Sequence, residues 1–169
     1  MHRAVILGLA LLLLAPAAAA APTFVITRDV NIGGFDRGAR VDRAVAVFGQ
    51  PTSRLVPRGG WDKCEIKWTA LGVSMVTHHV AAVKDPCGPE GRHVSTTVTD
   101  RRWRTSVGLK IGDPLAKLRK LYPRGYRDQP GVWWLTIRQW AGLPFPGLEA
   151  KVRNGKVVAL TVYGPRTPS

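Results

Sequence analysis

Residues 38–48 read GARVDRAVAVF and residues 112–122 read GDPLAKLRKLY, and the two stretches align without a gap. Their apolar positions coincide in pairs, which are Val41 and Leu115, Ala44 and Leu118, Val47 and Leu121, and Phe48 and Tyr122. Further along, residues 91–99 align with residues 155–163, and both stretches are rich in β-branched residues. A helix pattern followed by a strand pattern, occurring twice, predicts a tandem of two small α+β units.

We therefore expect an α+β fold of two tandem repeats, each a short helix packed on an antiparallel sheet of three to four strands. The first repeat is assigned to residues 21–100 and the second to residues 101–169, with a linker over residues 100–106 and a frayed tail at the C-terminus. Strands are expected over residues 61–69, 72–80, 93–99, 132–138, 147–153 and 156–163. Residues 23–27 have a strand-like composition and are either a first strand or a tether to the domain.

Turn and capping residues predict where the elements end. The first helix is expected from Ala39 to Phe48, because Gly49 follows it and favours a helix stop. Asp113 and Pro114 are expected to open the second helix, with the Asp113 carboxylate accepting hydrogen bonds from its first free N–H groups. Asn154-Gly155 predicts a two-residue hairpin turn between the last two strands.

Residues 1–20 have the pattern of a secretory signal peptide. Arg3 gives a positive start, residues 4–14 carry no polar side chain, and Ala18-Ala19-Ala20 provides small residues for cleavage after Ala20. No later stretch has the length of a transmembrane segment, and no cysteine follows the apolar run to carry a lipid. We expect a soluble secreted protein, extracellular or periplasmic.

The chain contains two cysteines, Cys64 and Cys87. In an exported protein an isolated pair of this kind predicts a disulfide, here within the first repeat. Neither cysteine lies in a CxxC motif, so a redox or catalytic role is not expected.

The chain is strongly basic, with 25 Lys and Arg against 11 Asp and Glu and a formal net charge of +14. Such a field attracts anions, and the candidates outside the cytoplasm are anionic envelope polymers, phospholipid surfaces, acidic proteins and nucleic acid. The alternative is that the charge serves solubility alone. Charge by itself indicates at most a class of partner.

Aromatic residues in the second repeat are the candidate partner-binding residues. Trp133 and Trp134 are neighbours in a predicted strand and should face opposite sides, so one can fill the core while the other lies at the surface. Exposed tryptophan is a common anchor of protein interfaces. Trp140, Phe145 and Arg138 would extend that patch, unless all these side chains simply cover the core of the second repeat.

Residues that could support catalysis or metal binding form no recognisable motif. His78 and His79 are adjacent in a predicted strand, so they point to opposite faces and cannot easily share a metal with His93. The serines lack a GxSxG context, and Gly33-Gly34 lacks the residues of a phosphate loop. We expect no cofactor, no metal and no enzyme activity.

Several short motifs together resemble a known repeat. They are Gly38, Phe48-Gly49-Gln50-Pro51, Lys67-Trp68, Gly112, Tyr122-Pro123, Trp134 and Asn154-Gly155-Lys156-Val157-Val158. This arrangement resembles the repeat of beta-lactamase inhibitory proteins, and the same unit is similar to that of the small outer-membrane lipoproteins that assist barrel assembly. The resemblance implies a non-enzymatic surface that grips a partner protein, although the second repeat lacks the disulfide of the inhibitor family. It does not carry over inhibition of a beta-lactamase.

The preferred hypothesis is a secreted binding protein that docks onto a protein partner, inhibitor-like or envelope-associated. The alternative is retention on anionic cell-envelope polymers, and the third hypothesis is a hydrolase of unrecognised type. Nucleic acid is a less favoured partner, because the motifs of the known binding modules are absent.

Overall fold

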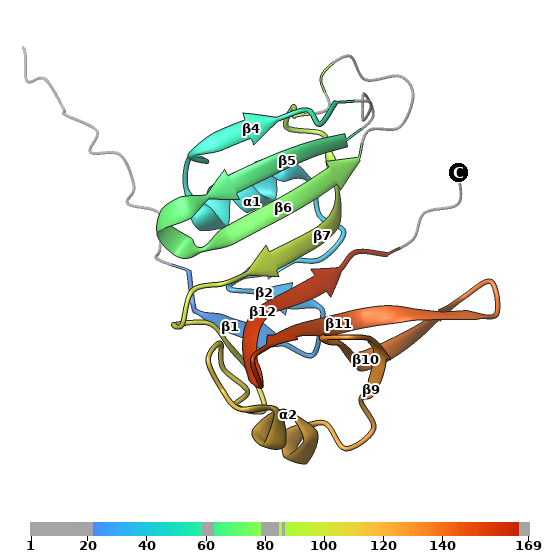
Figure 1. Cartoon of the computed structure of the whole chain (residues 1–169). Helices are drawn as coiled ribbons and strands as arrows, with labels where there is room; N and C mark the ends of the chain where they lie inside the picture. The colour runs from blue at the N-terminus through green and yellow to red at the C-terminus, as the bar shows by residue number, and fades with distance from the viewer. Residues whose placement is uncertain (1–21, 59–62, 79–84, 86, 166–169) are drawn as a thin grey trace, which may run out of the picture.

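The computed structural model describes residues 22–58, 63–78, 85 and 87–165. Its helices are α1 (Val41–Phe48), the 3-10 helix η1 (Thr69–Leu71) and α2 (Leu115–Leu121). Its strands in chain order, shown in Figure 1, are β1 (Val25–Thr27), β2 (Asn31–Ile32), β3 (Phe35–Asp36), β4 (Ser53–Leu55), β5 (Lys63–Trp68), β6 (Val73–His78), β7 (Arg92–Val98), β8 (Arg104–Thr105), β9 (Tyr126–Gln129), β10 (Val132–Trp140), β11 (Leu143–Arg153) and β12 (Lys156–Tyr163).

These strands form two sheets. The larger has eight strands in the order β4-β5-β6-β7-β12-β11-β10-β9, and the smaller has four in the order β3-β2-β1-β8. Neighbours in the larger sheet run antiparallel, whereas β1 and β8 are parallel. Figure 1 shows α1 behind β5 and β6, and α2 below the lower end of β12.

One face of the eight-stranded sheet, the core face, carries the hydrophobic core. A row of paired residues crosses it from β5 to β10, namely Trp68, Val73, Val98, Leu160, Ala150 and Trp133. All six are buried. Both helices reach this row, because the Phe48 ring of α1 lies 5.3 Å from the Trp68 ring and the Arg119 guanidinium of α2 lies 5.2 Å from the Trp133 ring.

The opposite face, the open face, is defined by the adjacent row of paired residues, namely Lys67, Ser74, Thr97, Thr161, Glu149, Trp134 and Tyr126. Successive residues of a strand point to opposite sides, so this row faces away from the core. Its members are half-buried or exposed. The hydroxyls of Thr97 and Thr161 lie 3.0 Å apart and share a hydrogen bond across two strands. The open face is therefore polar except at its Trp134 end.

The prediction of two tandem repeats, each with its own three- to four-stranded sheet, is wrong. Strand β7 of the first predicted unit pairs with β12 of the second, from Val98 with Leu160 to Ser95 with Tyr163. One core cluster contains side chains from both units, for example Ile66 and Leu148. A small separate sheet would leave edge N–H and C=O groups unpaired, and each half alone buries little apolar area. The fold is α+β only loosely, because the described residues are mostly in strands and contain two α-helices.

The segment expected to be the linker is part of the core instead. Trp103 is fully buried, packs edge-on against Phe24 at 5.1 Å, and donates its indole N–H to the carbonyl of Leu71 over 2.8 Å. The next residues form β8, which joins the smaller sheet beside β1. An aromatic ring of this size is stabilised by burial and by a partner for its N–H. Residues 100–106 thus connect the two sheets rather than separate two units.

The local predictions mostly hold. Helix α1 ends at Gly49, whose φ of 80° is easily reached by glycine, and Asn154 and Gly155 both have positive φ, as a two-residue hairpin turn requires. The expected cap by Asp113 is wrong. Its carboxylate accepts the N–H of Lys110 over 2.7 Å and pairs with Lys117, while α2 begins without a side-chain cap.

The disulfide between Cys64 and Cys87 is confirmed, and it ties β5 to the segment that precedes β7. The predicted signal peptide, residues 1–20, and the tail beyond Pro165 lie outside the described residues. Among the described helices, none has the length and apolar character needed to cross a membrane.

Candidate functional site

A pocket of about 420 Å³ opens at the β9–β12 end of the open face. Two residues of the open-face row, Trp134 and Glu149, form part of its wall. The other side chains that define its chemistry are Asp128 of β9, Phe145 of β11, Tyr163 of β12 and Val94 of β7. The pocket therefore combines side chains from strands far apart in the sequence.

Aromatic rings form the apolar part of this wall. The Trp134 ring packs against Tyr126 with centroids 5.1 Å apart and an interplanar angle of 56°. Tyr126 is 39% exposed, whereas Phe145 is buried. The exposure of Trp134 is intermediate between those of Tyr126 and Phe145. One part of its ring is therefore packed, and another part is available at the pocket. A ring fixed in this way contacts a ligand with little loss of side-chain entropy.

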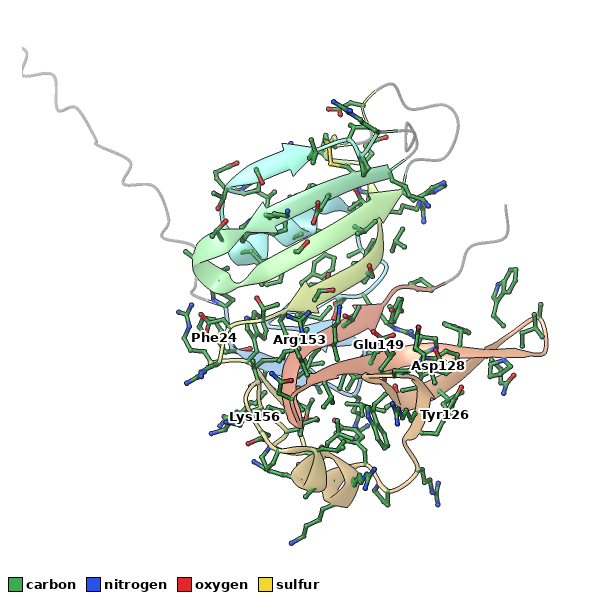
Figure 2. The ribbon with its side chains drawn as sticks, viewed as in Figure 1. Phe24, Tyr126, Asp128, Glu149, Arg153 and Lys156 are labelled. Carbon is green, nitrogen blue, oxygen red and sulfur yellow. A yellow bond between two sulfur atoms is a disulfide. The ribbon has the colours of Figure 1, made fainter. Side chains whose placement is uncertain are left out.

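Two carboxylates supply the polar part of the wall. Figure 2 shows Glu149 and Asp128 in the same region of the sheet, with Tyr126 below them. The Tyr163 hydroxyl donates to Oε2 of Glu149 over 3.0 Å. Burial raises the pKa of Glu149 and the charge of Asp128 adds to the increase, while the bond from Tyr163 and the charge of Lys151 oppose it. Burial and the charge of Glu149 raise the pKa of the Tyr163 hydroxyl, which keeps it a donor.

The structure brings two of the predicted binding residues, Trp134 and Phe145, together at the pocket. Trp133 instead lies on the core face, where the guanidinium of Arg119 covers its ring. Trp140, at the end of β10, is 36% exposed and does not line the pocket. The two neighbouring tryptophans therefore do occupy opposite faces of β10.

Arg138, expected to extend the partner-binding patch, is paired with Asp29 of the same chain. Its Nε donates to Oδ2 of Asp29 over 2.8 Å, and Thr136 donates to the same oxygen over 2.9 Å. The pair joins the β1–β2 turn to β10 and is mostly buried, with side-chain exposures of 21% and 12%. Arg138 is thus held in an internal ion pair.

Sequence reasoning missed Tyr126, Asp128, Glu149 and Tyr163. Each is an ordinary strand residue with no motif around it, and only the pairing of four strands places them together. The one local signal is the Asn154-Gly155 turn, which indicates that β11 and β12 form a hairpin. That turn alone does not give the register at Glu149.

His93 is buried among structural contacts. His93 is buried, accepts the N–H of Gly38 at Nδ1 over 3.2 Å, and contacts Thr96 Oγ1 through Nε2 over 2.9 Å. Burial lowers the pKa of His93 to about 4. His79 lies outside the described residues, within which no group of three or more His, Cys, Asp and Glu side chains could hold a metal ion.

Exposed basic side chains are found on and beyond α2, namely Arg119, Lys120, Arg124 and Arg127. Figure 2 shows Lys156 above α2, toward the lower part of the molecule, and Lys156 pairs with Arg153 at the turn end of the β11–β12 hairpin. This basic region is a second candidate surface, of opposite charge to the pocket.

Comparison with protein-family models, with curated proteins and with solved structures found no match to this chain. The resemblance to beta-lactamase inhibitory proteins and to the barrel-assembly lipoproteins therefore stays a prediction.

Proposed function

We propose that this chain is a secreted, non-enzymatic binding protein that docks a protein partner on its open face around Trp134. The observation that carries the proposal is the pocket that Trp134, Phe145 and Tyr163 line together with the carboxylates of Glu149 and Asp128. Aromatic side chains beside a few polar groups are typical of the energetic centres of protein interfaces.

Two further observations support the proposal. Tyr126 extends the aromatic surface beyond the pocket and is 39% exposed, so a partner larger than the pocket would bury additional ring area. The disulfide between Cys64 and Cys87 is compatible with a compartment outside the cytoplasm, as the predicted signal peptide requires. Extracellular and periplasmic locations both satisfy this requirement.

The proposal is tested by affinity capture from the extracellular and envelope fractions of the producing cell. The bait is the mature chain, compared with the Trp134→Ala and Trp134→Phe variants after thermal unfolding shows that both fold. We expect one stoichiometric protein that stays bound at high salt, is lost with Trp134→Ala and is partly kept with Trp134→Phe.

Leu55→Ala is the matched control. Leu55 is 58% exposed and lies on β4, the opposite edge of the eight-stranded sheet from β9. This variant should capture the same protein as the wild type. Equal capture by the Trp134→Ala variant would contradict the docking site, because the partner would then bind elsewhere.

The basic region around α2 favours a second candidate function, which is retention on anionic cell-envelope polymers. Charge-driven binding of this kind weakens steeply as salt rises, by analogy with counterion release from nucleic acids. The double variant Lys120→Glu/Arg124→Glu should then release the protein from isolated envelope polymer at lower salt, while Trp134→Ala should have no effect. Salt-independent retention would contradict this second candidate.

A further inference from the structure

The charged side chains of the pocket at the β9–β12 end are negative, whereas the chain as a whole is strongly positive. The chain has a formal net charge of +14, yet the charged side chains lining the pocket are Asp128 and Glu149, with no lysine or arginine among them. A region of negative charge inside a strongly basic protein selects ligands differently from the rest of the surface.

Neither carboxylate forms an ion pair with another described residue. Within the described part of the chain, no lysine or arginine nitrogen lies within 4.0 Å of Asp128 or Glu149. Most other carboxylates of the described residues are paired with Lys or Arg, namely Asp29, Asp42, Glu65, Glu90, Asp100 and Asp113. Asp36 and Asp85 are not, and they accept hydrogen bonds from Asn31 and from the N–H of Cys87 instead. Lys151 acts on Glu149 only through its longer-range charge. The pocket therefore has two acceptor groups and no internal cation to satisfy them.

The orientation of Glu149 leaves one acceptor for a ligand. Tyr163 donates to Oε2, and in the described part of the chain Oε1 accepts no hydrogen bond. Burial raises the free energy of the Glu149 charge, as the raised pKa of this carboxyl shows. A bound cation would remove that cost, whereas an anion would add to it.

The rings supply the second element of cation recognition. Trp134, Phe145 and Tyr163 line the pocket, and an aromatic face attracts a cation within about 6 Å of the ring centroid. The volume of about 420 Å³ accommodates the end of a long side chain. Carboxylates with aromatic walls favour an organic cation over a hydrated metal ion, because the rings contact alkyl and planar nitrogen groups.

We infer that this pocket binds the protonated amine or guanidinium at the end of a lysine or arginine side chain presented by the protein partner. The inference rests on the proposed function, for which it names the chemistry that the partner must supply. Oε1 of Glu149 accepts the N–H groups of the cation, Asp128 provides the second negative charge, and the Trp134 ring packs on the alkyl part.

The test uses the mature chain and three probes, followed by the indole N–H signals of the tryptophans in NMR titrations. The probes are the pentapeptide Gly-Gly-Arg-Gly-Gly with blocked ends, the same peptide with neutral citrulline in place of arginine, and butylammonium. We expect saturable shifts with the arginine peptide, at least tenfold weaker binding of the citrulline peptide, and weaker binding of butylammonium.

Two isosteric variants give the matched comparison. Glu149→Gln keeps the shape of the pocket and should weaken the arginine peptide about tenfold, whereas Glu65→Gln should leave it unchanged. Glu65 is a suitable control because it lies on β5 and is already paired with Lys67 at 3.2 Å. Equal binding of the arginine and citrulline peptides, or no effect of Glu149→Gln, would overturn the inference. Butylammonium carries the alkylammonium group of a lysine side chain, so failure of both it and the arginine peptide to give saturable shifts would also overturn the inference.

Failure here is distinguishable from failure of the proposed function. If the peptide does not bind but capture of a partner still depends on Trp134, the open face docks proteins by other contacts. If the peptide binds and no captured protein depends on Trp134, the cation site exists and the proposed protein partner does not.

Discussion

Asp29 and Arg138 lie 109 residues apart in the sequence, and Nε of Arg138 donates to Oδ2 of Asp29 over 2.8 Å. A second bond runs from Nη2 of Arg138 to the Asp29 carbonyl over 3.3 Å. These contacts join the β1–β2 turn of the smaller sheet to β10 of the larger one. Asp29 itself adopts a φ of 53°, in the left-handed region, which is uncommon for non-glycine residues but more frequent for Asp than for most.

Removing this ion pair should destabilise the fold. Asp29→Asn leaves the Arg138 guanidinium without its counter-charge in a mostly buried site, and we expect a loss of roughly 2 to 3 kcal/mol in the free energy of unfolding. Chemical denaturation measures the change. The control is Asp42→Asn, which removes the exposed Arg40–Asp42 pair and should shift the unfolding midpoint far less. Equal shifts would show that burial of the Asp29 pair contributes nothing.

Gly147→Ala should disrupt the Asp29–Arg138 ion pair without changing either of its two residues. A Cβ at Gly147 would collide with Oδ2 of Asp29 and lie 2.6 Å from Nε of Arg138. The carboxylate must then move away from its donors, so this small substitution should destabilise the protein to a similar extent as Asp29→Asn. In the double variant the two losses should be less than additive, because both act on one contact. Full additivity in denaturation experiments would contradict the mechanism.

Trp103 should be among the most costly residues to remove, although it lies in the segment predicted to be a linker. It is fully buried between Phe24 and Phe48, and Trp103→Ala should cost about 3 to 5 kcal/mol by leaving a cavity. Denaturant titration measures this cost. Trp140→Ala, at a site 36% exposed, is the control and should cost much less. A small loss of stability with Trp103→Ala would support the original prediction that residues 100–106 form a linker.

Burial of His93 predicts a pH dependence of stability. The folded pKa is lowered from 6.5 to about 4, so between these values the unfolded chain binds a proton that the folded chain does not. Stability should therefore fall as pH is lowered from about 6.5 to 4, by about 3 kcal/mol at most from this residue. The measurement is urea denaturation at several pH values in this window.

His93→Gln is the control for that experiment. It removes the titrating group, so the difference in stability between wild type and variant should shrink as pH falls from 6.5 to 4. The difference also cancels the contribution of Glu149, whose raised pKa stabilises the folded state on acidification. A difference that stays constant across the window would refute the assignment to His93.

Loss of the disulfide should destabilise the protein without changing its architecture. The cysteines are 23 residues apart, and closing a loop of that length stabilises by about 3 kcal/mol on the chain-entropy model. Replacing both cysteines by alanine should lower the denaturation midpoint accordingly. Reductant should then lower the midpoint of the wild type and leave the double variant unchanged. A wild type insensitive to full reduction would contradict this prediction.

At the candidate site, the local sequence pattern predicts the position of some residues and not of others. The alternation of β10 was enough to predict that Trp133 and Trp134 occupy opposite faces, because side-chain direction follows from strand geometry alone. Glu149 could not be placed in the same way. An uninterrupted register from the Arg153–Lys156 pair would set Glu149 opposite Leu160, but a shift between Lys151 and Val152 sets it opposite Thr161 on the open face. Such a bulge depends on how the whole sheet twists and packs.

The sequence by itself determined the two α-helices and the six longest strands of the described residues, the Asn154-Gly155 turn and the cysteine pair, because periodicity, turn residues and composition act over a few neighbouring residues. Only the tertiary structure decided that β7 and β12 pair to make one eight-stranded sheet, that Trp103 enters the core, and that Asp128 and Glu149 meet beside Trp134. Those contacts join residues distant in the chain. They arise because unpaired strand edges and exposed apolar faces are costly, and burying them together is the arrangement that removes both costs.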